Sequence, residues 1–263
     1  IARQRKAVSE LRQKLEGIDD PAAKALLGSA DFLIRRSVWI IGGDGWAYDI
    51  GYGGLDHVFA CGRDVNILVL DTEVYSNTGG QASKATPRGA VAKFAAGGKP
   101  SGKKDLGMMA MSYGNVFVGQ ISLGANPLHA IKTIRAAEAY RGTSLIIAYA
   151  HCIGHGINMT AGMSLQKEAV ACGYWPLYHF DPNAETNPFS LDSKPPKGAF
   201  KDFAMQQARF AMLARAKPED SERLLRLGQE DINRRWNLYE QLAATTRGGG
   251  NGEEKQEEKE VQA

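Results

Sequence analysis

The chain has 263 residues, of which 32 are Lys or Arg and 29 are Asp or Glu, so its formal net charge at pH 7 is +3. That balance is too mild for a nucleic-acid-binding surface. No apolar run approaches the roughly 18 residues of a membrane span, and the N-terminus lacks the apolar core of a signal peptide. Its three scattered cysteines form no disulfide framework. We therefore expect a cytoplasmic protein with neither nucleic acid nor membrane as partner.

Helices are predicted at the start of the chain. Residues 3–16 carry apolar side chains at roughly helical spacing. Asp20 followed by Pro21 is typical of a helix start, with Pro at the first helical position. We expect residues 1–32 to form helices that lead into a main domain at residues 33–200.

The main domain is predicted to alternate strands with helices. Four short apolar runs rich in β-branched residues are typical of strands covered on both faces of a parallel sheet. These runs are residues 38–41, 65–71, 116–122 and 144–150. Helical patterns lie between them at residues 52–62, 103–114 and 126–142. The alternation predicts an α/β fold with a mostly parallel sheet flanked by helices.

The C-terminal region has a different character. Residues 201–246 have the pattern of two or three helices and are predicted to form a helical C-terminal region. Residues 247–263 are Gly-rich and then strongly charged. Such a composition cannot bury a core, so we predict that this tail is disordered.

Polar residues follow the first two predicted strands directly. Asp44 comes after the first strand, and Asp71 and Thr72 come after the second. Because the carboxyl ends of parallel strands share one edge of a sheet, these residues are expected side by side. A carboxylate, a hydroxyl and a backbone carbonyl, completed by phosphate oxygens and water, would suit Mg²⁺. The flanking glycines would let backbone N–H groups approach a diphosphate, although an Asp in a Gly-rich turn is the alternative interpretation.

Longer stretches of the sequence resemble a known family. Gly43-Asp44-Gly45, followed by Thr72 and Val74, is similar to the thiamine-diphosphate motif. The blocks "GGDGWAYDIGYGGLDHV", "DTEVYSNTGGQASKATPRGAVAKFAA", "GKKDLGMMAMSYG" and "CGYWPLYHFDP" resemble the C-terminal thiamine-diphosphate domain of the pyruvate:ferredoxin (flavodoxin) oxidoreductases. The resemblance covers roughly residues 30–185 and implies the thiamine-diphosphate-binding fold.

The resemblance also implies a role for individual residues. The Mg²⁺ ligands would be the Asp44 carboxylate, the Thr72 hydroxyl and the Val74 carbonyl. Asn77 would lie near the reacting carbon, as the catalytic residue. The diphosphate of the cofactor would be wrapped by two segments, which comprise Gly43, Asp44, Gly45 and Trp46, and Thr72, Glu73, Val74, Tyr75, Ser76 and Asn77.

Cys152 follows the last predicted strand at the same edge of the sheet. A buried cysteine is usually a small apolar residue, and zinc binding with the neighbouring His151 and His155 lacks the usual ligand spacing. The resemblance implies instead that Cys152 is one ligand of a [4Fe–4S] cluster. Such a cluster needs four thiolates, and Cys61 and Cys172 are predicted to be packing residues, so the other three would come from outside this chain.

Other polar residues have simpler interpretations. His129 is predicted to be a solvated residue of a helix. Lys84, Arg88 and Lys93 flank a loop that is either solvated or in contact with coenzyme A phosphates.

The resemblance implies an activity that this chain would share with other parts of an enzyme. The expected reaction is the oxidative decarboxylation of pyruvate with coenzyme A to acetyl-CoA and CO₂, with electrons passing through Fe–S clusters to ferredoxin or flavodoxin. The carboxylate that activates the cofactor's pyrimidine ring has no equivalent here. We expect it in the remaining domains or in a partner subunit of a homodimeric enzyme. The alternatives are a β subunit of a multi-subunit 2-oxoacid oxidoreductase, and a non-catalytic remnant or assembly module.

Overall fold

The computed structural model describes residues 1–245. The chain divides into two compact units, Ile1–Val38 and a larger unit that begins at Trp39. The tail predicted to be disordered, residues 247–263, lies outside the described residues, as does residue 246 at the end of the predicted helical region.

The first unit consists of short helices, as its sequence pattern predicts. They are α1 (Ala2–Leu15), α2 (Pro21–Ser29) and the 3₁₀ helix η1 (Ala30–Leu33). Asp20 caps α2, and its side chain accepts hydrogen bonds from the backbone N–H groups of Ala22 at 2.7 Å and Ala23 at 3.2 Å. Val8 and Ala30 are the buried apolar residues of this unit.

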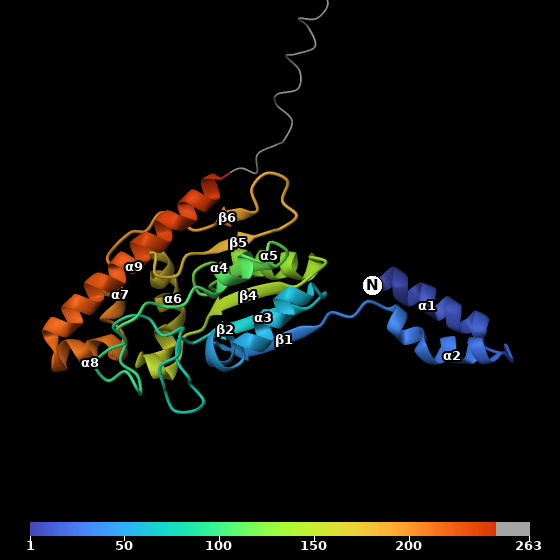
Figure 1. The fold of residues 1–263 in the computed structure, drawn as a ribbon, viewed down its shortest axis with the longest axis horizontal. Helices are drawn as coiled ribbons and strands as arrows, with labels where there is room; N and C mark the ends of the chain where they lie inside the picture. Colours follow the sequence, from blue (N-terminus) through green and yellow to red (C-terminus); the bar gives the residue numbers. More distant parts are fainter. Residues whose placement is uncertain (246–263) are drawn as a thin grey trace, which may run out of the picture. The chain divides into compact units, whose positions relative to one another are not determined.

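The larger unit is built on a six-stranded sheet with the order β1-β2-β4-β3-β5-β6 (Figure 1). The strands are β1 (Trp39–Gly43), β2 (Asn66–Asp71), β3 (Phe117–Ile121), β4 (Ser144–Tyr149), β5 (Tyr178–Phe180) and β6 (Phe189–Leu191). The first four are parallel, and β5 and β6 add antiparallel strands at one side. The mostly parallel α/β fold is confirmed, while the two short antiparallel strands carry no apolar run long enough to have predicted them.

Helices cover the sheet and extend beyond it. They are the π-helix η2 (Gly45–Ile50), α3 (Tyr52–Cys61), α4 (Leu106–Met111), α5 (Pro127–Ala139), the 3₁₀ turns η3 (Ile153–His155) and η4 (Met159–Ala161), α6 (Gly162–Ala171), α7 (Phe200–Ala204), α8 (Ala208–Ala216) and α9 (Pro218–Ala244). The C-terminal pattern thus resolves into three helices, and α9 packs against α7 and α8 (Figure 1). No described helix has both the length and the apolarity that crossing a membrane requires.

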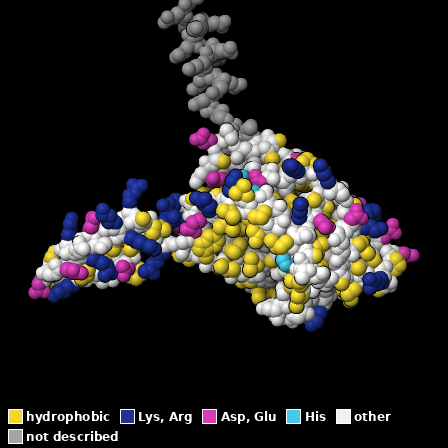
Figure 2. All heavy atoms as spheres, turned by 180° about the vertical axis from the view of Figure 1, so that it is seen from behind, with side chains coloured by type: hydrophobic (Ala, Val, Ile, Leu, Met, Phe, Trp, Pro, Cys, Tyr) yellow, Lys and Arg dark blue, Asp and Glu magenta, His cyan; other side chains and the backbone are white. Residues whose placement is uncertain are grey.

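The two faces of the sheet are covered unequally. One face carries the main core, in which strand residues such as Ile67 and Val69 pack with Leu55 and Phe59 of α3. On the other face α5 contacts β3 and β4. Toward β1 this second face is exposed, and Ile41 and Leu70 keep 63% and 42% of their surface accessible. Figure 2 shows hydrophobic side chains gathered over a broad area of the larger unit.

The order of strands brings three strand ends together. β1 ends at Gly43, β2 at Asp71 and β4 at Tyr149, and these parallel neighbours are paired in register along their length. The residues that follow each of them therefore meet at one edge of the sheet. This edge holds the candidate site.

Candidate functional site

The three predicted metal ligands meet at the hydroxyl of Thr72. Its Oγ1 lies 2.8 Å from Oδ1 of Asp44 and 3.0 Å from the carbonyl oxygen of Val74. The Ser76 hydroxyl is 2.9 Å from the same atom. The Ser76 hydroxyl also donates to the Val74 carbonyl at 3.4 Å. The oxygens of this cluster therefore outnumber the hydroxyl protons available to them.

The carboxylate in this cluster is buried without a cationic partner. Asp44 is 1% exposed, and its second oxygen accepts a hydrogen bond from the Ser83 hydroxyl at 2.7 Å. Burial raises the pKa of Asp44 above its ordinary value, despite the hydroxyls of Ser83 and Thr72 and the attraction of Lys103. Among the described residues its hydrogen bonds come from hydroxyls alone, which leaves a negative charge that a cation would stabilise.

The donor set fits Mg²⁺ better than a transition metal. The described residues contain no group of three or more His, Cys, Asp or Glu side chains that could hold a metal ion. Magnesium needs no such cage, because it takes one or two carboxylates together with substrate phosphates and water. One carboxylate, one hydroxyl and one carbonyl around a shared point match that requirement.

Aromatic rings occupy the space that several nearby glycines leave. A Cβ on Gly42 would lie 2.4 Å from the ring of Trp46, and one on Gly51 only 2.1 Å from it. A Cβ on Gly45 would lie 2.4 Å from the ring of Tyr75, whose hydroxyl donates to the Gly45 carbonyl at 3.2 Å. These glycines are therefore required by close packing of Trp46 and Tyr75, and the space beside them is not free for phosphates.

Open space lies at the neighbouring positions. Nothing approaches a Cβ on Gly43 more closely than the Leu70 carbonyl oxygen at 4.0 Å. Ser76 and Asn77 are exposed in the turn that follows β2. The backbone of Gly43 and of this turn is thus open to an approaching diphosphate.

Glu73 is held on the buried side of the same segment. Its side chain is fully buried, and its oxygens lie 3.2 Å from Nζ of Lys103, 2.8 Å from Nη2 of Arg209 and 2.6 Å from the hydroxyl of Tyr174. The residue adopts a left-handed backbone, with φ at 61°. Its carboxylate is therefore committed to the protein interior, and only its backbone is available to a diphosphate.

Asp71 completes this buried charge cluster. Its Oδ2 accepts from the Tyr48 hydroxyl at 2.6 Å and lies 2.8 Å from Nζ of Lys103. Burial raises the pKa of Glu73, but Lys103 and Arg209 outweigh it and lower that pKa to about 2. The cluster therefore holds Glu73 ionised and anchors the residue that separates two of the predicted metal ligands.

Cys152 lies beside the metal-ligand segment. It is 8% exposed, and its sulfur accepts from the Gly154 N–H at 3.3 Å. A Cβ on Gly154 would lie 3.2 Å from Val74 and 3.6 Å from the Cys152 sulfur. Nearby, Nε2 of His155 donates to the Thr72 carbonyl at 2.6 Å, because a carbonyl oxygen can only accept. Burial lowers the pKa of His155 to about 3, so its ring is neutral.

The other two cysteines lie elsewhere, and one differs from its prediction. Cys172 is buried, as predicted, and its thiol donates to the Ala169 carbonyl at 3.5 Å. Cys61 is exposed at the end of α3, with its sulfur 3.4 Å from Nε2 of His57. The prediction that Cys61 is a packing residue is wrong, because α3 turns this position outward.

The predicted basic loop is largely paired with carboxylates. Nζ of Lys84 lies 2.9 Å from Asp49, and Nε of Arg88 lies 2.6 Å from Asp231. Lys93 is exposed. Arg88, with 20% of its side chain accessible, is therefore tied to α9 rather than extended into solvent.

His129 also differs from its prediction. Its side chain is 12% exposed, and its Nε2 lies 2.9 Å from Oδ2 of Asp192. Asp192 directly follows β6, one of the strands that the sequence pattern did not reveal. The prediction of a solvated histidine is wrong because these late strands supply its partner.

Comparison with known proteins places this geometry in context. The family described as "Thiamine pyrophosphate enzyme, C-terminal TPP binding domain" matches residues 22–148. A putative pyruvate-flavodoxin oxidoreductase of Synechocystis sp. is 59% identical over 95% of this chain and 21% of its own length. The pyruvate:ferredoxin oxidoreductase of Moorella thermoacetica is 56% identical over 81% of this chain and 18% of its own length.

The chain is thus similar to one part of the pyruvate:ferredoxin (flavodoxin) oxidoreductases, and its residues 22–148 match a thiamine-diphosphate-binding domain. It spans about one fifth of the length of these relatives. Among solved structures, a 2-oxoglutarate:ferredoxin oxidoreductase from Magnetococcus marinus aligns over 43% of this chain and 40% of its own, with a TM-score of 0.41 and 23% identity. That likeness is too distant to bear on the site.

The matched thiamine-diphosphate domain contains part of the site. Asp44, Thr72 and Val74 lie within residues 22–148. Cys152 and Arg209 lie beyond them, although Arg209 reaches Glu73 between Thr72 and Val74. Sequence reasoning missed Lys103 and Arg209, which are 30 and 136 residues from Glu73, and no local pattern marks such distant partners.

Proposed function

We propose that this chain binds the diphosphate of thiamine diphosphate through Mg²⁺. The Asp44 carboxylate, the Thr72 hydroxyl and the Val74 carbonyl would hold the metal. The observation that carries this proposal is the meeting of their oxygens within 3.0 Å of Thr72 Oγ1. When bound, thiamine diphosphate supplies the electron sink for decarboxylating a 2-oxoacid.

The chain's own residues would have distinct tasks at this edge of the sheet. Backbone N–H groups from Gly43 to Trp46 and from Thr72 to Asn77 would orient the diphosphate. The Asn77 amide would hydrogen-bond the substrate near the reacting carbon. Its exposed position in the turn after β2 is compatible with that task.

The whole enzyme would oxidatively decarboxylate pyruvate with coenzyme A to acetyl-CoA and CO₂. The names of the relatives support pyruvate as the substrate, and ferredoxin or flavodoxin as electron acceptor. Cys152 would contribute one thiolate to a [4Fe–4S] cluster, and three further thiolates would come from the remaining domains. We place this enzyme in the cytoplasm as a homodimer.

One alternative is a separate β subunit of a multi-subunit 2-oxoacid oxidoreductase. The relatives carry their matching segment within a polypeptide about five times longer, which favours a segment of one large chain. A non-catalytic remnant is the other alternative. The close meeting of Asp44, Thr72 and Val74 argues against decay of the site.

Calorimetric titration of the 263-residue chain with thiamine diphosphate, with and without Mg²⁺, tests this proposal. We expect metal-dependent binding that Asp44→Asn abolishes and Thr72→Val weakens at least tenfold, because each removes a ligand oxygen. Asp202→Asn, at an exposed position of α7, is the matched control and should bind like wild type. Equal binding by Asp44→Asn and wild type would contradict the metal assignment.

A further inference from the structure

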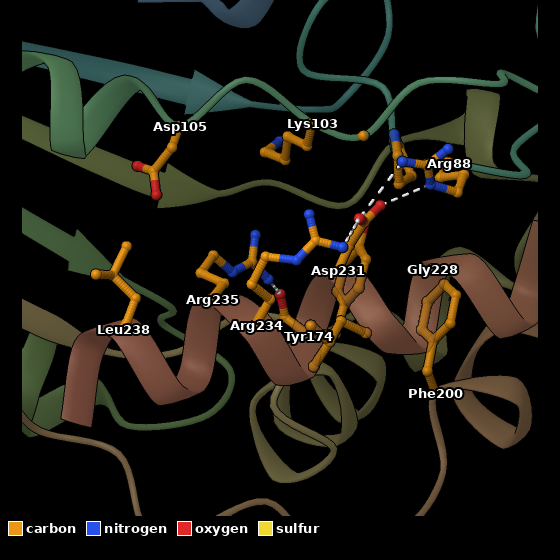
Figure 3. Close-up of a pocket in the computed structure, with 13 residues that line it drawn as sticks. Arg88, Lys103, Asp105, Tyr174, Phe200, Gly228, Asp231, Arg234, Arg235 and Leu238 are labelled. Carbon is orange, nitrogen blue, oxygen red and sulfur yellow. Dashed lines mark hydrogen bonds and ion pairs between the residues drawn. The ribbon is translucent and has the colours of Figure 1, made fainter. Parts of the chain in front are cut away.

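A cavity of about 260 Å³ lies between α9 and the loop that precedes α4. Figure 3 shows Asp231, Arg234, Arg235 and Leu238 of α9 facing the loop that carries Lys103. None of the proposed metal ligands or diphosphate-binding residues lines this cavity. It is therefore a site apart from the one described above.

The two carboxylates of this cavity have different partners. Asp231 lies 2.6 Å from Nε of Arg88 and 3.7 Å from Arg234, and the pair with Arg88 is drawn in Figure 3. Asp105 accepts from the Tyr239 hydroxyl at 2.6 Å and from the Met108 N–H at 3.0 Å. Asp231 is thus neutralised by arginines, whereas Asp105 is held by neutral donors at the end of the cavity nearest α4.

Arg235 is the cation on the cavity wall that lacks a counter-ion. Its Nη2 donates to the Tyr174 carbonyl at 2.5 Å. Its Nε is buried and has no hydrogen-bond partner in the described part of the chain, where no carboxylate lies within ion-pair distance of its guanidinium. Lys103, by contrast, is neutralised by Asp71 at 2.8 Å and by Glu73 at 3.2 Å.

A permanently charged guanidinium without a counter-ion is suited to an anion. The guanidinium has five donors in a planar fork that matches carboxylates and phosphates. No carboxylate of the described residues pairs with this charge, and an anionic ligand would supply the missing counter-charge. Arg234, 77% exposed beside Asp231, adds a second positive charge at the edge of the cavity.

The other walls are apolar. Tyr174, Phe200, Ile232 and Leu238 line the cavity together with Gly228. A Cβ on Gly228 would lie 2.9 Å from Cε1 of Phe200, so the glycine lets that ring lie against α9. Apolar walls with a few polar groups are typical of small-molecule sites, although this cavity is smaller than the usual ~300 Å³ lower bound.

We propose that this cavity binds a small organic anion, with its carboxylate or phosphate on Arg235 and its apolar body between α9 and Phe200. The guanidinium of Arg235, which has no counter-ion among the described residues, defines the position of the anionic group. The small volume limits the body to about one aromatic ring or its aliphatic equivalent.

Calorimetric titration of the chain with phenylacetate, phenyl phosphate and neutral phenylacetamide tests this proposal. The titrations contain neither Mg²⁺ nor thiamine diphosphate, and they are repeated on Asp44→Asn, so that failure of the cofactor site cannot change the result. We expect at least one anion to bind at least tenfold more tightly than the amide. Binding of phenylacetate alone would indicate a carboxylic acid as the natural ligand, and binding of phenyl phosphate alone a phosphate ester.

Two variants locate the binding. Arg235→Met should weaken anion binding at least tenfold, whereas Arg226→Met on the exposed side of the same helix should not change it. Leu238→Trp, at a position that is 42% exposed, should fill the cavity and remove binding without disturbing the core. The proposal is overturned if neither anion binds, if the amide binds equally well, or if Arg235→Met and Leu238→Trp both bind like wild type.

Discussion

Two buried carboxylates, Asp44 and Glu73, lie on opposite sides of one short segment and differ in their partners. Glu73 faces Lys103 and Arg209, and its pKa is lowered to about 2 despite burial. Asp44 faces only hydroxyls, and burial raises its pKa. The protein thus neutralises one carboxylate itself and leaves the other to be neutralised by something that binds.

The difference separates a residue that stabilises the fold from one that we propose to bind a metal. Glu73 is neutralised by residues of the chain itself. Removing one of these residues should therefore lower the free energy of unfolding. Asp44 should instead lower the free energy of unfolding when no metal is present, because natural sites often trade stability for function. The predictions below test this contrast.

The largest effect is expected when the buried cluster is broken at Arg209. Arg209→Met would leave Glu73 with one cation in place of two and lower the free energy of unfolding by about 3–5 kcal/mol, as is usual for a broken buried ion pair. Denaturant unfolding measures this change. Arg215→Met, at an exposed position of the same helix, should cost less than about 0.5 kcal/mol. Equal losses for the two variants would show that Arg209 does not compensate Glu73.

A smaller loss of stability is expected from overpacking at Gly45, the residue that follows Asp44. The Cβ of Gly45→Ala would lie 2.4 Å from the Tyr75 ring. We expect this overpacking to lower the free energy of unfolding by about 1–3 kcal/mol. Gly53→Ala in α3 is the control, because nothing lies within 4 Å of its Cβ, and it should stabilise the chain by about 0.5–1 kcal/mol. Thermal unfolding of both variants checks the opposite signs.

Asp44→Asn sharpens the comparison because its effect on stability should have the opposite sign to that of Arg209→Met. Without metal, removal of an uncompensated buried charge should raise the free energy of unfolding by about 0.5–2 kcal/mol. With Mg²⁺ and thiamine diphosphate present, wild type should gain stability and the variant should not. A variant less stable than wild type in metal-free buffer would mean that Asp44 is already compensated by the protein.

Asp192 provides an intermediate case, since its partners are histidines whose charge depends on pH. Despite burial, hydrogen bonds from His129 and His179 hold the pKa of Asp192 well below its usual range. The bond to Asp192 in turn raises the pKa of His179, and nearby Asp181 adds to it. His179 therefore adds stability below pH of about 6.5, its unfolded pKa, and this contribution disappears as pH rises through its higher folded pKa.

The stability difference between wild type and His179→Gln measures this contribution between pH 6 and pH 9. It should be at most about 1 kcal/mol, because the His179 side chain is 39% exposed and its ion pair is screened by solvent. The difference should shrink as pH rises. A stability difference that stays constant across this pH range would show that His179 does not form a stabilising ion pair with Asp192.

The sequence predicted what local patterns and general topology determine. Apolar runs located the four parallel strands. For β3 and β4 the reason is burial on both faces, which requires apolar residues throughout. The run of β1 is equally apolar although one of its faces is exposed, which the pattern did not predict. The rule that parallel strands end at one edge then placed Asp44 beside Thr72. Neither inference needs knowledge of distant contacts.

The remaining features depend on contacts between distant residues. The partners of Glu73 come from a loop and from α8, and the partner of His129 follows the short strand β6. The glycines around Asp44 were interpreted as space for phosphates, but Trp46 and Tyr75 fill much of that space. Tertiary packing determines each of these features, so they could not be predicted from residues that are neighbours in the sequence.

The tie between Arg209 and Glu73 has a consequence for how the molecule can be divided. Helix α8 delivers a guanidinium to a carboxylate 136 residues earlier in the chain, in the segment between two proposed metal ligands. A shortened protein that stops at residue 200 would retain the whole sheet. In it, the Glu73 carboxylate would keep the ammonium group of Lys103 but lose the guanidinium of Arg209. A shortened version of this fold that keeps Glu73 paired with both of its cations must therefore extend at least through α8.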